Sequence, residues 1–145
     1  MQKIVPFLWF DGKAEEAAKF YVSIFKNSTM LTVTPMSVTF QLEGQQFYAL
    51  NGGPQYTFTP AISLFVNCET QQEVDELWGK LSASASDEQC GWLKDKYGLS
   101  WQIIPSILGK LMSDKNTKRA GAAVQAMLKM KKLDIKGLQQ AFDAA

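Results

Sequence analysis

Apolar residues along the chain follow two spacings, one typical of strands and one typical of helices, in an order that occurs twice. A strand over Ile4–Phe10 precedes a helix over Ala14–Phe25, and a strand over Ala61–Val66 precedes a helix over Thr70–Leu81. Within both predicted helices the apolar residues recur every three or four positions, so that they form one face. Each helix is followed by a β-hairpin.

The two predicted hairpins are the part of the chain in which the repeat is most apparent. The first covers Val38–Leu50 with its turn at Gly44, and the second covers Trp92–Pro105 with its turn at Asp95–Gly98. A glycine in each turn permits the positive φ that a tight reversal requires. The two turn glycines lie 54 residues apart, and the strands and helices repeat at offsets of 56 and 57. Such similar offsets predict a repeated strand–helix–hairpin unit. We expect Trp92 to face Trp101 across the second hairpin, in the core.

The end of the chain is predicted to be helical. Ser106–Met112 is expected to form a short helix and Thr117–Lys132 a longer one, and Asp134 is a good N-cap for a last helix. The apolar positions of this tail are Val124, Met127, Leu128, Leu138 and Phe142. If all were exposed, they would form a larger apolar patch than soluble monomers normally carry. We therefore expect a homodimer, the alternative being that the tail packs on its own domain.

Composition and charge limit the classes of function. The 145 residues are 46% hydrophobic, which is typical of one globular domain with a core. No apolar run approaches ~18 residues and no leader follows the first methionine, so we expect no membrane partner and a cytoplasmic protein whose Cys68 and Cys90 are reduced. Residues 1–109 carry 7 basic and 11 acidic groups, whereas residues 110–145 carry 8 basic and 3 acidic groups. Because the basic tail has almost no aromatic side chains, we expect no nucleic-acid partner.

The sequence lacks the residues that several kinds of catalytic chemistry require. The chain contains no histidine, which excludes Ser-His-Asp and Cys-His nucleophile systems. No predicted strand leads into a Gly-x-Gly-x-x-Gly turn, so no nucleotide-binding loop is predicted. Cys90 could act as a thiolate near Lys94, although a small buried side chain at the start of a strand is the favoured interpretation.

Seven short stretches carry a resemblance to a known family. They are Leu8–Gly12, Ala14–Ala17, Phe20-Tyr21, Ala49–Pro54, Cys68–Thr70, Cys90–Lys96 and Ser100–Ile103. Together they resemble the PhnB-like branch of the vicinal-oxygen-chelate superfamily, the branch called 3-demethylubiquinone-9 3-methyltransferase. The superfamily also contains glyoxalase I, extradiol dioxygenases and bleomycin-resistance proteins, so the resemblance is specific for fold and weak for activity.

The resemblance implies an α+β fold with two βαβββ modules, over about 4–52 and 61–105, and a helical tail over about 106–145. The whole chain, 1–145, would be a single glyoxalase-like domain with a pocket inside its concave sheets. In metal-dependent relatives four strand positions supply His, Gln or Glu ligands, and these positions fall near Val5, Tyr48, Ala61 and Gln102. Valine and alanine offer no donor and the Gln amide is neutral, so we expect no metal and no cofactor.

The remaining hypothesis is a small-molecule pocket. Alternation along the strands is expected to give it an apolar and aromatic lining with a few polar groups. The expected ligand-binding residues are Phe7, Trp9, Tyr48, Leu50, Phe65 and Gln102. Two alternatives remain open: an enzyme of the same family that acts without a metal, with Cys90, Gln102 and Tyr48 as catalytic candidates, and a structural dimer with a vestigial pocket.

Overall fold

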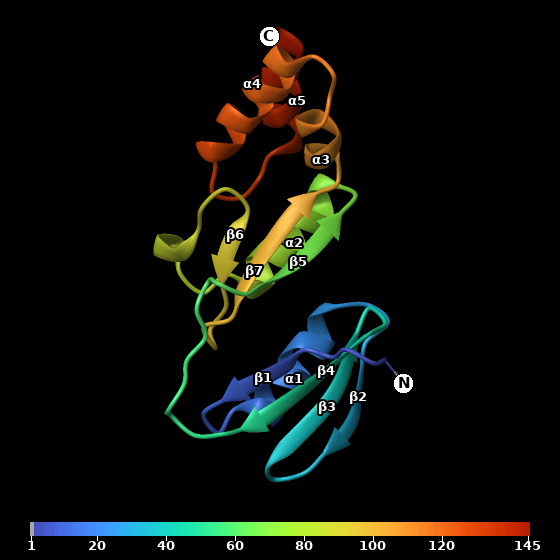
Figure 1. The fold of residues 1–145 in the computed structure, drawn as a ribbon, viewed down its shortest axis with the longest axis vertical. Helices are drawn as coiled ribbons and strands as arrows, with labels where there is room; N and C mark the ends of the chain where they lie inside the picture. Colours follow the sequence, from blue (N-terminus) through green and yellow to red (C-terminus); the bar gives the residue numbers. More distant parts are fainter. Residues whose placement is uncertain (1) are drawn as a thin grey trace. The chain divides into compact units, whose positions relative to one another are not determined.

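The computed structural model describes residues 2–145 and divides the chain into two compact units, the first ending at Phe58 and the second covering Thr59–Ala145. The first unit has the order strand, helix and three strands (Figure 1). Its elements are β1 (Phe7–Phe10), α1 (Ala14–Ile24), β2 (Thr29–Val33), β3 (Ser37–Leu42) and β4 (Gln45–Asn51). The sheet order is β1-β4-β3-β2, with β1 parallel to β4 and the other pairs antiparallel. This is the predicted βαβββ module.

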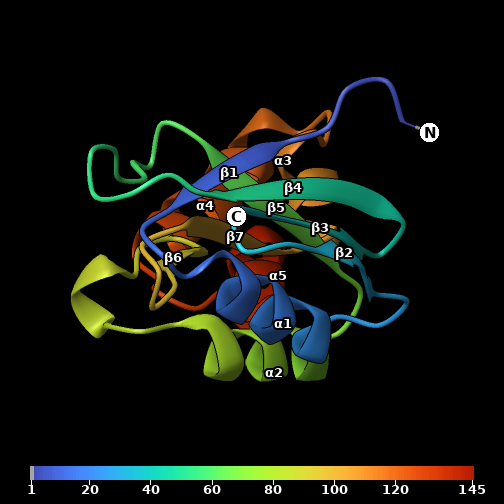
Figure 2. The ribbon, with the colours of Figure 1, turned by 90° about the horizontal axis from the view of Figure 1, so that it is seen from below.

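The core of the first unit lies between its sheet and α1. Figure 2 shows α1 along one face of the four strands. Every second residue of β3 is buried, as are Phe47 and Ala49 of β4, and the Phe40 and Phe47 rings stack with their centroids 5.3 Å apart. Tyr21 of α1 is fully buried and its ring lies 6.4 Å from that of Phe40. The alternating strand pattern therefore leaves the opposite face of the sheet without a helix of this unit.

The second unit begins with a similar module and ends with the tail. Its elements are β5 (Ser63–Cys68), α2 (Gln71–Leu81), the 3₁₀ turn η1 (Ala85–Asp87), β6 (Trp92–Lys94), β7 (Ser100–Pro105), α3 (Ile107–Met112), α4 (Thr117–Leu128) and α5 (Ile135–Ala144). The sheet order is β5-β7-β6, with β5 parallel to β7. A loop containing η1 stands where the first module has β2, in agreement with the small polar sequence of Ser82–Glu88.

The second hairpin pairs its strands in a different register from the one that would place Trp92 opposite Trp101. The pairs are Trp92 with Gln102, Leu93 with Trp101 and Lys94 with Ser100. Neighbours across a ladder share a face, so Trp101 is buried on the α2 side while Trp92 lies half-buried on the opposite face. The prediction that the two tryptophans face one another in the core was therefore wrong. The turn that closes with the Asp95 N–H donating to the Leu99 carbonyl, at 2.9 Å, sets this register.

The tail packs on its own unit. Helices α3, α4 and α5 gather at the end of the sheet where β5 and β7 finish (Figure 1). Their buried cluster consists of Ile104, Leu108, Leu111, Ala123, Leu133 and Leu138, with Met127 and Phe142 half-buried against it. Of the apolar tail positions named above, Leu128 stays 50% exposed. The tail therefore does not present the large patch from which a homodimer was expected, and that assembly remains a prediction.

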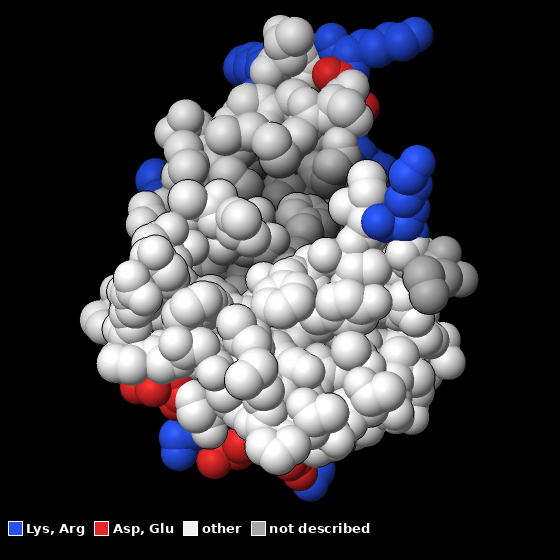
Figure 3. All heavy atoms as spheres, turned by 60° about the horizontal axis from the view of Figure 1, so that its bottom comes forward, with Lys and Arg blue, Asp and Glu red and all other residues white. Residues whose placement is uncertain are grey.

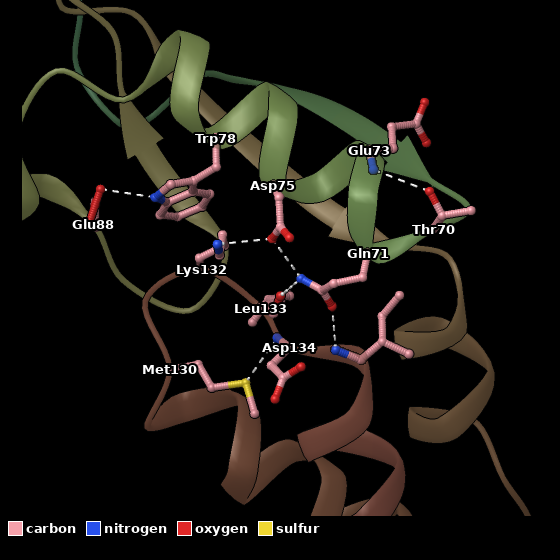
Figure 4. A network of polar contacts seen from close by, with 11 residues as sticks. Thr70, Gln71, Glu73, Asp75, Trp78, Glu88, Met130, Lys132, Leu133 and Asp134 are labelled. Carbon is pink, nitrogen blue, oxygen red and sulfur yellow. Dashed lines mark hydrogen bonds and ion pairs between the residues drawn. The ribbon is translucent and has the colours of Figure 1, made fainter.

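Hydrogen bonds attach the segment between α4 and α5 to the second module. The Gln71 amide nitrogen donates to the Leu133 carbonyl at 3.0 Å, and its oxygen accepts from the Ile135 N–H at 2.8 Å (Figure 4). Lys132 pairs with Asp75 of α2 at 2.9 Å. On the other side, the backbone N–H of Cys90 donates to the Met130 carbonyl at 2.7 Å. None of the helices in residues 2–145 is long and apolar enough to cross a membrane.

Candidate functional site

The open face of the first sheet carries four of the predicted ligand-binding residues in neighbouring positions. The register pairs Phe7 with Tyr48, and Trp9 with Leu50. The Phe7 and Tyr48 rings meet edge to face with centroids 6.0 Å apart, and Phe7 is 58% exposed. Tyr48 is also paired with Thr39 of β3, so a threonine hydroxyl lies beside the aromatic rings on this face. This face can contact the flat apolar part of a small molecule and offer hydroxyls beside it.

Trp9 is held in place by the loop that follows β4. Its indole N–H donates to the Gly53 carbonyl at 2.9 Å, and the Tyr56 ring meets it edge to face with centroids 5.0 Å apart. Gly52 lies so close that a Cβ there would come within 2.3 Å of the indole. The Asn51 side chain fixes the loop by accepting from the Ala14 N–H at 2.8 Å. The sequence Asn-Gly-Gly therefore serves to position a tryptophan.

The open face of the second sheet brings the other two predicted residues together. Phe65 is paired with Gln102 across β5 and β7, and Phe65 is 52% exposed. The Gln102 amide nitrogen donates to the Ser63 hydroxyl at 2.9 Å. On its other side Gln102 is paired with Trp92. An aromatic, an amide and an indole thus cross this sheet in one row.

Beside β6 the second unit contains an open cavity of about 430 Å³. Its lining residues are Pro60, Asp87, Gln89, Cys90, Trp92, Leu93, Lys94 and Ser100. Sequence reasoning named Cys90 as a candidate but missed Trp92 and Ser100 as lining residues. The alternation that placed Gln102 on the open face also places Ser100 there, two residues earlier, so that pattern could have revealed it.

The two cysteines have different environments, and neither forms a disulfide. Cys68 is fully buried at the end of β5, and burial, with smaller effects from the carboxylates of Glu73 and Glu69, raises the pKa of its thiol to about 12. Cys90 is half-buried in the left-handed backbone region with φ of 40° and lines the cavity. Of the two thiols, only Cys90 is therefore placed to meet a small molecule.

The three catalytic candidates do not form one demonstrated cluster. Tyr48 lies on the open face of the first unit, 36% exposed. Gln102 and Cys90 belong to the second unit, where Gln102 sits on the open face of β7 and Cys90 in the cavity wall before β6.

The four strand positions that a metal would use in this fold do not fit one. Val5 and Ala61 have no donor atom in their side chains, and the Gln102 amide is already bound to Ser63. No group of three or more His, Cys, Asp or Glu side chains capable of holding a metal ion occurs in the described part of the chain. A divalent ion prefers carboxylate or imidazole ligands, which this set does not supply.

The surface drawn in Figure 3 is mainly uncharged. Lys, Arg, Asp and Glu side chains lie chiefly towards the edges of this view, and no basic patch spreads across it.

Comparison with known proteins agrees with the fold and the motifs. Residues 2–104 match the family model described as 3-demethylubiquinone-9 3-methyltransferase. Among solved structures, the chain is 38% identical to a PhnB protein from Bacillus cereus of that same description, over 72% of this chain and 100% of that one, with a TM-score of 0.63. The comparison with curated proteins found no match.

Two more distant structures show the fold alone. Protein PA1353 from Pseudomonas aeruginosa is 18% identical over 72% of this chain and 98% of its own, with a TM-score of 0.57. A possible glyoxalase from Bacillus cereus is 10% identical over 71% of this chain and 99% of its own, with a TM-score of 0.50. Both similarities therefore extend over part of this chain and over nearly the whole of the other protein.

Proposed function

Because the chain belongs to the 3-demethylubiquinone-9 3-methyltransferase family, a PhnB-like branch of the glyoxalase-fold proteins, we propose that it binds a small, partly apolar molecule without a metal. The observation that carries the proposal is the open face of β1 and β4, where Phe7, Trp9, Tyr48 and Leu50 occupy four adjoining positions. Exposed aromatic rings on a rigid sheet, with one tryptophan fixed by its own loop, are typical of ligand contacts.

Binding without methyl transfer fits the residues better than the methyltransferase activity in the family's name does. The sequence has no Gly-x-Gly-x-x-Gly turn after a strand, which methyl-donor and dinucleotide sites commonly use. The four positions that could bind a metal lack a suitable donor set, so the proposed site relies on aromatic contact and on neutral hydrogen-bonding groups.

The experiment is a thermal-shift screen of cellular metabolites, followed by titration of each hit. Phe7→Ala and Tyr48→Ala remove exposed rings, so both variants should keep their fold and lose most of the ligand-induced shift in Tm. Leu128→Ala removes a similarly exposed apolar side chain from α4 and is the matched control, which should bind like the wild type. Equal binding by all four proteins would contradict the proposal. A chelator should leave the shift unchanged, and its loss would contradict metal independence.

An enzyme of the same family is the second candidate, and the position of Cys90 in the cavity wall favours it. A turnover assay on each hit separates this candidate from a binding protein. Conversion of a hit by the wild type, abolished in Cys90→Ser with binding retained, would establish the enzyme. Unchanged hits after long incubation would leave binding as the function.

A further inference from the structure

The cavity beside β6 presents hydrogen-bond donors that the protein itself does not use. Ser100 is 3% exposed, yet its hydroxyl lines the cavity and has no hydrogen-bond partner anywhere in residues 2–145. The indole N–H of Trp92, another lining residue, also has no partner within that range. Neither group is among the fully enclosed side-chain atoms that lack a partner in residues 2–145, so both reach solvent and are available to a bound molecule.

A positive charge stands next to this hydroxyl. Lys94 is the cross-strand partner of Ser100, so their side chains leave the sheet on the same face as neighbours. The Lys94 ammonium has one ion pair in the described chain, to Asp87 at 3.8 Å, with the two side chains 36% and 39% exposed. An ion pair that long and that exposed is weak, so the ammonium remains able to bind another anion.

The rest of the lining is apolar and flat. Trp92, Leu93 and Pro60 contribute carbon surface to the cavity. The cavity volume of about 430 Å³ falls in the range of sites for small ligands. The only acidic group in the lining is Asp87, and its carboxylate opposes an anionic ligand.

We propose that this cavity binds a small monocarboxylate with a flat apolar body, whose carboxylate accepts hydrogen bonds from the Ser100 hydroxyl and the Lys94 ammonium. The inference goes beyond the proposed function, because it concerns a different site, in the second unit, and names the ligand class of that site. The apolar body packs on Trp92 and Pro60, while Asp87 weakens binding by competing for Lys94. None of these five residues belongs to the set predicted from the sequence to bind the ligand.

The test compares benzoate with benzamide, its neutral counterpart of the same shape. We expect benzoate to bind the full-length protein at least about tenfold more tightly, since charged hydrogen bonds are the stronger ones. Equal affinities for the two compounds would overturn the anion assignment while leaving the proposed function intact. If neither compound binds and the metabolite screen also gives no hit, both proposals fail together.

Single substitutions assign the contacts. Lys94→Met and Ser100→Ala should each weaken benzoate binding about fivefold or more, with little effect on benzamide. Because the Ser100 hydroxyl has no partner in the protein, Ser100→Ala should keep the wild-type Tm, which separates a ligand contact from a structural role. Asp87→Asn should tighten benzoate binding, and Lys110→Met on α3 should leave it unchanged. Wild-type benzoate affinity in Lys94→Met, or weaker affinity in Asp87→Asn, would overturn the proposal.

Discussion

The carboxylate of Asp95 accepts a hydrogen bond from the indole N–H of Trp101 at 2.9 Å, between two side chains that are almost fully buried. The other oxygen of the same carboxylate accepts from the backbone N–H groups of Tyr97 and Leu99, at 2.8 and 3.0 Å. One side chain therefore closes the turn of the second hairpin and anchors its central tryptophan against α2.

Replacing Asp95 with alanine should destabilise the protein strongly. The substitution removes three hydrogen bonds that a buried carboxylate accepts, and we expect the free energy of unfolding to fall by about 2–4 kcal/mol. Urea unfolding followed by circular dichroism measures the change. Asp143→Ala, which removes an exposed carboxylate from α5, is the control and should lie within about 0.5 kcal/mol of the wild type. A similar small effect for Asp95→Ala would show that the network contributes little.

A second prediction concerns the loop that positions Trp9. In Gly52→Ala the new methyl group meets the indole, which must move, so the hydrogen bond to Gly53 should break. We expect a loss of about 1–3 kcal/mol and a large shift of the Trp9 indole N–H resonance in NMR spectra. Gly121→Ala on α4 meets open space and should instead stabilise the protein by up to about 1 kcal/mol. An unmoved Trp9 resonance in Gly52→Ala would contradict the positioning role.

The order of strands and helices could be predicted from the sequence. The face of the sheet on which a strand residue lies depends on how the strand is aligned with its neighbour, and this register could not be predicted. The helices begin and end close to the predicted positions because Thr70 and Asp134 are good N-caps, and both caps form. Phe7, Trp9, Tyr48 and Leu50 were placed on one face correctly because alternation alone decides that along a strand. The pairing of Phe7 with Tyr48 and of Phe65 with Gln102 could not be derived from offsets alone.

Trp92 shows why the rest of the site escaped sequence reasoning. A shift of one residue in a hairpin moves every side chain of one strand to the other face. The turn fixes Leu93, not Trp92, opposite Trp101, and this fact depends on hydrogen bonds of the Asp95 backbone that no composition or spacing reveals. The cavity further requires η1 and Pro60 to lie beside β6, which is a matter of tertiary packing.

A third prediction follows from the pKa of Cys68. Burial raises the folded-state pKa to about 12 from an ordinary 9.0, so between these values the unfolded state releases a proton that the folded state keeps. The contribution of Cys68 to stability is therefore complete below about pH 9 and decreases as the pH rises towards 12. We expect the stability difference between the wild type and Cys68→Ala to be constant up to about pH 9 and to shrink from there to pH 11. A constant difference would contradict the raised pKa.

The same environments predict selective alkylation. At pH 8 iodoacetamide should modify Cys90 in the native protein and leave Cys68 unmodified, because a buried thiol that does not ionise reacts poorly. Mass spectrometry of a digest identifies the modified cysteine, and denaturation before labelling should expose both. Equal labelling of the two native cysteines would mean that β5 opens readily.

Another prediction tests how the tail is held. Gln71→Ala removes two hydrogen bonds to the segment before α5, and we expect a loss of about 1–3 kcal/mol and faster hydrogen exchange at Ile135. Gln72→Ala is the matched control, since Gln72 bonds only to Glu76 on the same helix and is exposed. If both variants exchange alike, the tail is held by its apolar cluster alone.

The last prediction is that the protein is a homodimer joined through the edge of its first sheet. Strand β2 is last in that sheet and leaves its outer backbone groups unpaired within the described chain. Leu31, Val33 and Met36 on and beside this strand are 44%, 48% and 67% exposed. An apolar edge of this kind favours pairing with another strand, and a second copy related by a two-fold axis offers the same edge.

Sedimentation equilibrium at micromolar concentration measures the mass directly. We expect about twice the chain mass of 16.2 kDa for the wild type, and the monomer mass for a Leu31→Lys and Val33→Lys double variant, because two lysines on each edge repel across the two-fold axis. Leu128→Lys places the same charge on the exposed side of α4 and should stay dimeric, since the tail already packs on its own unit. A wild type that sediments at 16.2 kDa would end the prediction, and a dimer disrupted only by Leu128→Lys would move the interface to the tail.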